Sequence, residues 1–213
     1  MVEIIPAILT KDFKDFKSKV EAVEQYTKWV QLDVSDGDFA PSRTWNDPAK
    51  LRYYDPGVFV EVHLMVAEPE SVIREWARSG AKRIYFHYEA TTRHEELIAI
   101  LNAAGVEAGV ALLPETPLST IKLFDELLDA VLLFSGSLGF YGGTFNEEAT
   151  LPKITSLRQA HPELIIEIDG GMNPETASKA VDAGANAIVS GGFIFGSTDV
   201  QAAIAELKEA VNP

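Results

Sequence analysis

The chain contains no cysteine among its 213 residues. This absence excludes disulfide bonds, thiol nucleophiles and cysteine metal ligands. Apolar runs long enough to cross a bilayer are also missing, and residues 1–6 (MVEIIP) lack the basic start and long apolar core of a secretory signal. We therefore expect a cytoplasmic protein with no membrane partner.

Positive charge is scarce as well. The chain has 18 Lys and Arg residues and 32 Asp and Glu residues, which gives a net charge of −14. Such a surface repels nucleic acid, so no nucleic-acid partner is expected. It would also repel a phosphorylated metabolite at long range. An anionic ligand therefore needs local capture by backbone N–H groups and helix N-termini.

Short apolar runs alternate with amphipathic segments along the whole chain. The predicted strands are residues 4–8, 29–34, 58–65, 83–88, 107–112, 130–134, 164–169 and 187–190. The predicted helices are residues 13–26, 69–79, 94–104, 117–128, 149–159, 174–183 and 200–211, with a short or irregular one over 47–54. This even alternation predicts one domain over residues 1–213, an α/β fold forming a single (β/α)₈ TIM barrel. A doubly wound open sheet shows the same alternation and is the alternative.

Two aspartates stand where predicted strands end, which is the working face of such a barrel. Asp33 follows Gln31 on the inward face of the second strand, and Asp169 closes the seventh. An acidic residue inside an apolar strand is costly unless it is used. Strands two and seven could face each other across a closed mouth. The pair could then serve as acid and base on opposite sides of a bound sugar.

The third predicted strand adds His63 and Met65 on one face. Taken alone, such a histidine is more often a hydrogen-bonded structural residue, and such a methionine fills a core. His87 ends the fourth strand, where it would support the site from behind or serve a structural role. Between the two aspartates in chain order, His63 makes the constellation more specific than either carboxylate alone.

Glycines cluster after the sixth, seventh and eighth predicted strands. In known barrels the loops after strands seven and eight commonly bind phosphate. Glycine in such loops lets backbone N–H groups approach an anion closely. Any one cluster would suit a tight loop, but three on successive strands favour a phosphate site. The candidates are Gly139, Gly142, Gly143, Gly170, Gly171, Gly191 and Gly192.

Together these motifs make the chain similar to the ribulose-phosphate 3-epimerase family of ribulose-phosphate-binding barrels. The resemblance runs nearly end to end. It rests on residues 6–9 (PAIL), 32–41 (LDVSDGDFAP), 62–66 (VHLMV), 86–90 (FHYEA), 139–145 (GFYGGTF), 168–172 (IDGGM) and 188–192 (IVSGG).

The resemblance implies a role for each matching residue. Asp33 and Asp169 correspond to two acid/base aspartates that exchange the proton at C3 of a phosphorylated ketose through an enediolate. They would also ligate a divalent metal (Zn, Mn, Fe or Mg) together with His63. Met65 would line the active site. The glycines match the phosphate loops.

This chain departs from the family on the face that carries the chemistry. Gln31 stands where the family has a metal-ligating histidine, and Ala7 where it has a serine that contacts substrate. A carboxamide oxygen binds hard cations but replaces imidazole poorly on zinc, so we expect weaker metal binding with zinc less favoured.

Ser35 and Phe134 replace methionines, and Ser137-Leu138 replaces an Asn-Pro pair. In the unusual segment 41–46, Arg43 and Trp45 could cover the mouth.

The residues and the resemblance lead to a sugar-phosphate 3-epimerase of the ribulose 5-phosphate/xylulose 5-phosphate type. One alternative is a lyase or decarboxylase of the same barrel group, whose pattern Asp-x-Lys-x-x-Asp on strand two is unmatched because residues 31–36 (QLDVSD) lack lysine. Another is a phosphosugar-binding barrel without catalysis or with altered specificity. A homo-oligomer is compatible with all three.

Overall fold

The computed structural model describes residues 2–136, 138–141 and 143–212. Within them, eight parallel strands close into a barrel in chain order, with β8 pairing β1. The strands are β1 (Glu3–Leu9), β2 (Trp29–Ser35), β3 (Phe59–Met65), β4 (Arg83–His87), β5 (Glu107–Leu112), β6 (Ala130–Phe134), β7 (Ile165–Asp169) and β8 (Ala187–Ser190). The predicted (β/α)₈ barrel is confirmed, and the closure between β1 and β8 excludes the open sheet.

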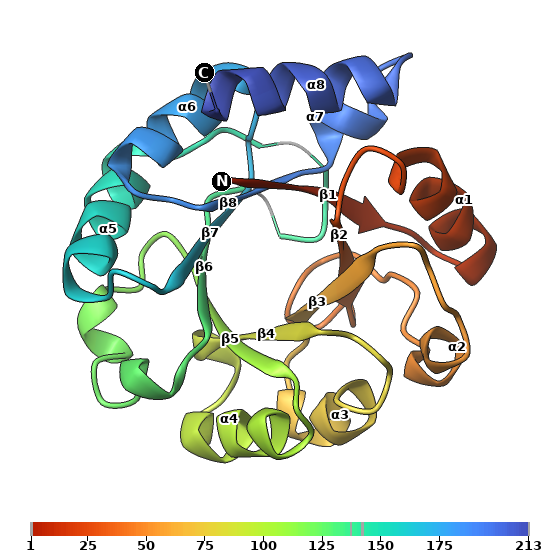
Figure 1. Ribbon diagram of the computed structural model, residues 1–213. Coiled ribbons are helices and arrows are strands. Elements are labelled where there is room, and N and C mark those ends of the chain that lie inside the picture. The colour runs from red at the N-terminus through yellow and green to blue at the C-terminus, as the bar shows by residue number, and fades with distance from the viewer. Residues whose placement is uncertain (1, 137, 142, 213) are drawn as a thin grey trace.

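Helices surround the barrel as an outer ring (Figure 1). They are α1 (Phe13–Val23), α2 (Pro48–Arg52), α3 (Pro69–Trp76), α4 (His94–Ala103), α5 (Glu147–Ala160), α6 (Pro174–Ala183), α7 (Gly192–Phe195) and α8 (Val200–Val211). Side-chain caps begin several of them, such as Asp12 on α1 and Asn173 on α6. Among the helices described, none is long and apolar enough to cross a membrane.

One predicted helix is wrong. Residues 117–128 form two 3₁₀ turns instead, η2 (Leu118–Thr120) and η3 (Asp125–Leu127). Ile121 and Phe124 are both buried and stand three residues apart. The backbone bonds in these turns run i→i+3, from the Ile121 N–H to the Leu118 carbonyl and from the Leu127 N–H to the Phe124 carbonyl, which is the 3₁₀ pattern. The short helix α7 after β8 was not predicted.

Side chains along each strand alternate between the helices and the barrel interior. On β3, Val60, Val62 and Leu64 pack in the core against the helices. Their neighbours Glu61, His63 and Met65 point inward and are buried as well. The interior therefore holds polar side chains in successive layers, and the upper layer forms the floor of the mouth.

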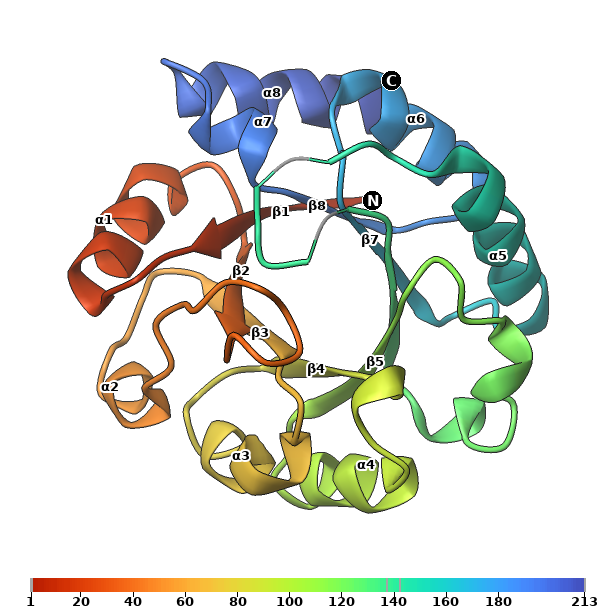
Figure 2. The ribbon, with the colours of Figure 1, turned by 180° about the vertical axis from the view of Figure 1, so that it is seen from behind.

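Lateral register brings the inward-pointing residues of neighbouring strands level with one another. Asp33 pairs with His63 between β2 and β3, and Phe134 pairs with Asp169 between β6 and β7. Figure 2 looks onto the end of the barrel where the strands finish and the connections to the helices begin. This end carries the candidate site.

Candidate active site

The two predicted acid/base residues lie together at the mouth of the barrel. Asp33 comes from β2 and Asp169 from β7, and they are 7% and 9% exposed. One carboxylate oxygen of each, and one ring nitrogen of His63, all lie within 4.8 Å of one another. Both side chains line the same cavity. Alternation on each strand and closure of the barrel thus bring together carboxylates 136 positions apart in the chain.

Gln31 lies beneath the two aspartates and is fully buried. Its side-chain Nε2 donates to Asp33 Oδ1 and to Asp169 Oδ2, each over 2.8 Å. Its Oε1 is buried and has no hydrogen-bond partner among the described residues. The amide therefore holds the two carboxylates toward each other with its N–H groups and leaves its own acceptor unpaired.

His63 faces the same two carboxylate oxygens from β3. Its Nδ1 lies 3.6 Å from Asp33 Oδ1 and 3.4 Å from Asp169 Oδ2. Its Nε2 lies 2.8 Å from Nε2 of His87, which stands behind it at the end of β4. Burial opposes the charged form of His63, but the two carboxylates outweigh that effect and raise its pKa to about 9.

Asp33, His63 and Asp169 form a donor set that fits a divalent cation. Two carboxylates and one imidazole converge, and Nδ1 of His63 is buried without a hydrogen-bond partner among the described residues. Burial and the neighbouring Asp169 raise the pKa of Asp33, while His63 and Gln31 counteract them. A cation would offset the repulsion between the two carboxylates.

The cavity at the mouth has a volume of about 250 Å³. Asp33 and Asp169 form one part of its wall, and Ala7, Met65 and Phe134 form the apolar part. The predicted glycines that line it are Gly139, Gly143, Gly170, Gly171, Gly191 and Gly192. Gly142, also predicted for the site, and Ser137 lie outside the described residues. The wall thus combines carboxylates on one side with bare backbone on the other.

Gly170 shows why this backbone is bare. Its φ is +112°, and a Cβ there would lie 2.1 Å from the backbone nitrogen of Gly136. A side chain would collide with the loop after β6, so only glycine allows the loops after β6 and β7 to meet.

Tyr141 is a cavity residue that sequence reasoning missed. Its ring lies against Gly191, where an added Cβ would come within 2.6 Å of it. Its hydroxyl accepts a hydrogen bond from the backbone N–H of Leu9 over 2.8 Å, which ties the loop after β6 to the end of β1. The only signal was its place inside the 139–145 motif, since a loop sequence does not reveal where an aromatic ring will point.

The expectation that Arg43 and Trp45 cover the mouth is wrong for both residues. Trp45 is 7% exposed and packs on Phe13 and Phe16 of α1, with ring centroids 5.2 and 5.4 Å apart. Burying a large aromatic ring against the helix layer is favourable, and this draws the segment away from the cavity. Arg43 extends into solvent near Asp38 and lines a neighbouring hollow beside Gly139.

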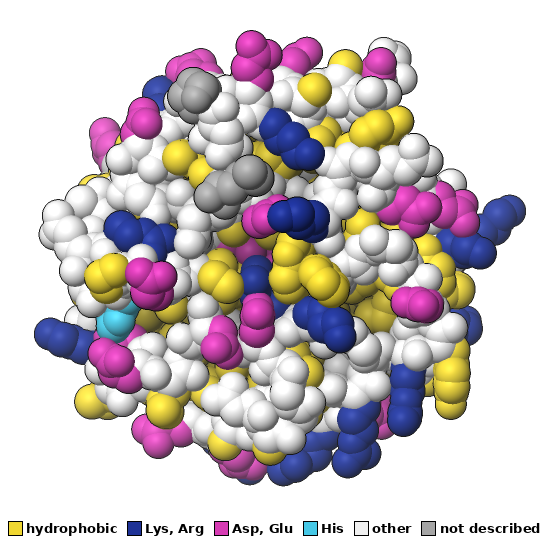
Figure 3. Space-filling model, viewed as in Figure 1, with side chains coloured by type: hydrophobic (Ala, Val, Ile, Leu, Met, Phe, Trp, Pro, Cys, Tyr) yellow, Lys and Arg dark blue, Asp and Glu magenta, His cyan; other side chains and the backbone are white. Residues whose placement is uncertain are grey.

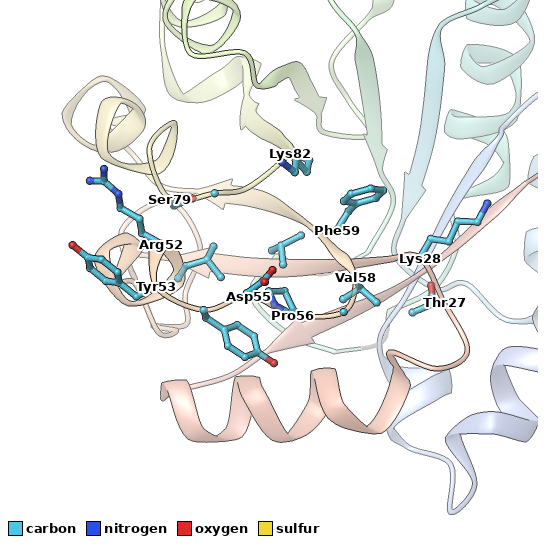
Figure 4. A pocket seen from close by; sticks show the side chains of 15 residues that line it. Thr27, Lys28, Arg52, Tyr53, Asp55, Pro56, Val58, Phe59, Ser79 and Lys82 are labelled. Carbon is cyan, nitrogen blue, oxygen red and sulfur yellow. The ribbon is translucent and has the colours of Figure 1, made fainter.

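Another hollow, of about 720 Å³, opens near the opposite ends of β2 and β3 (Figure 4). Lys28 and Arg52 lie at opposite ends of it, with Phe59 and Lys82 between them. Figure 3 views this end of the barrel, where Lys and Arg side chains gather over α2 and α3. None of the predicted site residues that the structure describes lines this hollow. The titratable cluster and the glycine loops therefore assign the candidate site to the mouth.

Comparison with known proteins agrees with this geometry. Residues 3–195 match the model of the ribulose-phosphate 3 epimerase family. Ribulose-phosphate 3-epimerase of Schizosaccharomyces pombe is 37% identical over 98% of this chain and 93% of its own length. The enzyme of the same name from Bacillus subtilis is 36% identical over 98% of this chain and 99% of its own.

Solved structures share the fold at low sequence identity. KGPDC from Streptococcus mutans superposes with a TM-score of 0.76 at 13% identity, covering 99% of this chain and 97% of that one. The 3-hexulose-6-phosphate synthase from Salmonella typhimurium gives 0.74 at 12% identity, over 98% of both chains. These likenesses establish the barrel architecture, whereas the sequence matches extend along nearly the whole chain. The chain belongs to the ribulose-phosphate 3-epimerase family.

Proposed function

We propose that this chain interconverts ribulose 5-phosphate and xylulose 5-phosphate by exchanging the proton at C3. The observation that carries the proposal is the placement of Asp33 and Asp169 in one cavity, with carboxylate oxygens within 4.8 Å. The relatives named as ribulose-phosphate 3-epimerases support the same reaction and make the chain an isomerase.

In this reaction one aspartate removes the C3 proton from one face of the sugar and leaves an enediolate. The other aspartate then donates a proton to C3 from the opposite face, which inverts that centre. The first aspartate ends protonated and the second deprotonated, so a proton returns through solvent between turnovers. Burial raises the pKa of Asp33, which makes its carboxylate a stronger base than one in water.

We further infer that Asp33, His63 and Asp169 hold a divalent cation. Bound there, the ion would act as a Lewis acid and stabilise the negative charge of the enediolate. Gln31 is the candidate fourth ligand through Oε1, the acceptor that lacks a partner among the described residues. Since carboxamide oxygen suits hard cations, manganese or magnesium should be favoured over zinc relative to a site with imidazole at this position.

The glycine side of the cavity is the proposed phosphate site. Gly170, Gly171, Gly191 and Gly192, with Gly139 and Gly143, leave backbone close to the bound anion because they have no side chains. The chain carries a net charge of −14, so these short-range contacts must act against long-range repulsion. Met65 and Phe134 would line the sugar carbons between the two sides.

Two further expectations accompany the proposal. We infer a cytoplasmic location, for which a rice relative named as a cytoplasmic isoform gives support. The expected homo-oligomer stays a prediction. A lyase or decarboxylase reaction is less favoured, because residues 31–36 lack the lysine of that pattern.

The test is the wash-in of solvent deuterium at C3 of ribulose 5-phosphate. Wild-type protein loaded with a divalent ion should exchange this hydrogen and form xylulose 5-phosphate. Asp33→Asn and Asp169→Asn should each lower the rate by roughly 10²–10⁴-fold, the usual contribution of an acid/base group. No exchange by wild-type protein with any of several divalent ions would refute the proposal. Binding of the sugar phosphate without exchange would support the non-catalytic alternative instead.

A further inference from the structure

Behind the mouth, two buried imidazoles meet nitrogen to nitrogen. Nε2 of His63 and Nε2 of His87 lie 2.8 Å apart, and both residues are 0% exposed. At this distance one nitrogen must carry a hydrogen and the other must offer a lone pair, since two donors or two acceptors would repel. The contact alone does not say which is which.

Glu89, which contacts the other ring nitrogen of His87, determines which imidazole donates. It lies in η1 (Tyr88–Ala90), and its Oε2 is 3.3 Å from His87 Nδ1. Its Oε1 accepts the backbone N–H of Leu113 over 2.9 Å and the hydroxyl of Thr116. Burial disfavours the charged form, but these hydrogen bonds outweigh it and lower the pKa of Glu89 to about 2. The side chain is therefore a carboxylate, which can only accept.

The direction of each hydrogen bond then follows in sequence. His87 must carry its hydrogen on Nδ1 to donate to Glu89, so its Nε2 is an acceptor when the ring is neutral. His63 must then donate from Nε2. Its second nitrogen, Nδ1, is left for the space between Asp33 and Asp169, where it lies 3.6 and 3.4 Å from their oxygens.

We propose that Glu89 and His87 are positioning residues that keep the hydrogen of His63 on Nε2 and so present Nδ1 to a divalent cation. The inference rests on the metal site of the proposed function. Partners that orient a ligating histidine are usually a carboxylate, a carbonyl or water. Here a second imidazole stands between the ligating histidine and the carboxylate and transmits the preference of that carboxylate.

Glu89→Gln should reverse the direction of the hydrogen bonds that link residue 89, His87 and His63, which we call the relay. The backbone N–H of Leu113 needs an acceptor, so the new amide would keep its oxygen there and turn its NH₂ toward His87. His87 would then accept at Nδ1 and donate from Nε2, which forces the hydrogen of His63 onto Nδ1. In a titration with Mn²⁺ alone, we expect affinity to fall by roughly 10- to 100-fold, the usual effect of losing such a partner.

The matched control is Glu70→Gln. Glu70 accepts a hydrogen bond from Thr91, and its replacement removes the same charge without contact to either histidine. This variant should bind Mn²⁺ like the wild type. Unchanged affinity in Glu89→Gln, or an equal loss in Glu70→Gln, would overturn the proposal.

A second variant pair separates orientation from packing. In His87→Gln the amide can accept a hydrogen bond from His63 and donate one to Glu89. This variant should therefore keep much of the wild-type affinity for Mn²⁺. His87→Leu fills similar space but leaves the His63 N–H unpaired, and should bind much more weakly. Equal losses in the two variants would assign His87 a packing role and refute the relay.

The tautomers can also be read without metal or substrate. Long-range ¹H–¹⁵N spectra of the metal-free wild type should show a neutral His87 with its hydrogen on Nδ1. A wild-type His87 with its hydrogen on Nε2 would overturn the proposal.

Wild-type protein that binds Mn²⁺ yet does not epimerise would count against the proposed reaction while the relay stands. Wild-type protein that epimerises but binds no Mn²⁺ would overturn the relay's link to metal.

Discussion

The side-chain amide of Gln31 donates to the carboxylate of Asp169 over 2.8 Å and thereby joins β2 to β7 across the barrel. A group that faces a metal site with N–H rather than with a lone pair must change its orientation to become a ligand. The oxygen and nitrogen of a carboxamide have nearly the same shape, so a half-turn would exchange them.

Gln31→His should raise the affinity for zinc. An imidazole at this position offers a nitrogen ligand that zinc prefers over a carboxamide oxygen. We expect Zn²⁺ to bind roughly tenfold tighter or more, which corresponds to about 1.4 kcal/mol. Competition with a chromophoric chelator measures this, and Gln31→Leu, which has no donor atom, is the control. Equal zinc affinity in wild type and Gln31→His would mean that Gln31 lies outside the coordination sphere.

Gly191→Ala should weaken binding of the sugar phosphate. The added Cβ would come within 2.6 Å of the Tyr141 ring and 3.0 Å of the Ala7 carbonyl oxygen, so the ring must leave its place. We expect KM for ribulose 5-phosphate to rise by about tenfold, or about 1.4 kcal/mol. Gly57→Ala is the control, because its Cβ would meet only Glu24, with the nearest atom 3.5 Å away. A normal KM in Gly191→Ala would show that Tyr141 can move at no cost.

Arg83→Met should destabilise the fold from inside the barrel. Arg83 Nη1 lies 2.9 Å from Glu61 Oε2 and 3.4 Å from Glu167 Oε2, and both glutamates are fully buried. Removing the only cation of this described group leaves carboxylates without compensation, which typically costs about 3–5 kcal/mol. Urea unfolding measures the loss.

Arg93→Met provides the comparison, because Arg93 forms an exposed pair with Glu96. Such surface pairs contribute about 0–1 kcal/mol. If the two variants lost similar amounts, the buried group would owe its stability to the packing of its side chains and not to its charge pairing.

The stability contributed by Glu89 should depend on pH on the acid side. Its folded pKa of about 2 lies below the unfolded value, because its hydrogen bonds outweigh burial. A lowered carboxyl pKa contributes stability above the unfolded value of about 4.3, and this contribution is lost as pH falls toward the folded one. The difference in unfolding free energy between wild type and Glu89→Gln should therefore shrink as the pH falls from about 5 to about 2. A difference that stays constant with pH would contradict the ionised state assigned to Glu89.

Much of the architecture could be predicted from local patterns. Alternation of side chains on a strand sends Gln31, Asp33 and His63 inward, and it depends only on backbone geometry. Residues 117–128 show where such patterns fail. Their apolar spacing suits a helix, but the backbone bonds there run i→i+3 and form two 3₁₀ turns.

Contacts between side chains of different strands could not be predicted in the same way. The meeting of His63 with His87 and of Arg83 with Glu61 and Glu167 depends on the stagger of neighbouring strands and on closure of the barrel. Tyr141 was missed because its direction is set by a hydrogen bond to Leu9, 132 positions away. Trp45 was misplaced because its ring packs on α1 instead of over the mouth.

Glu89 also connects the two histidines to the segment that follows β5. The same carboxylate accepts from Leu113 and Thr116 in the connection after β5. A change at Thr116 would alter how firmly Glu89 is held, and through it the hydrogen on His63. Thr116, Glu89 and His87 should therefore change together among relatives, as residues under joint selection do, although only His87 touches a candidate metal ligand.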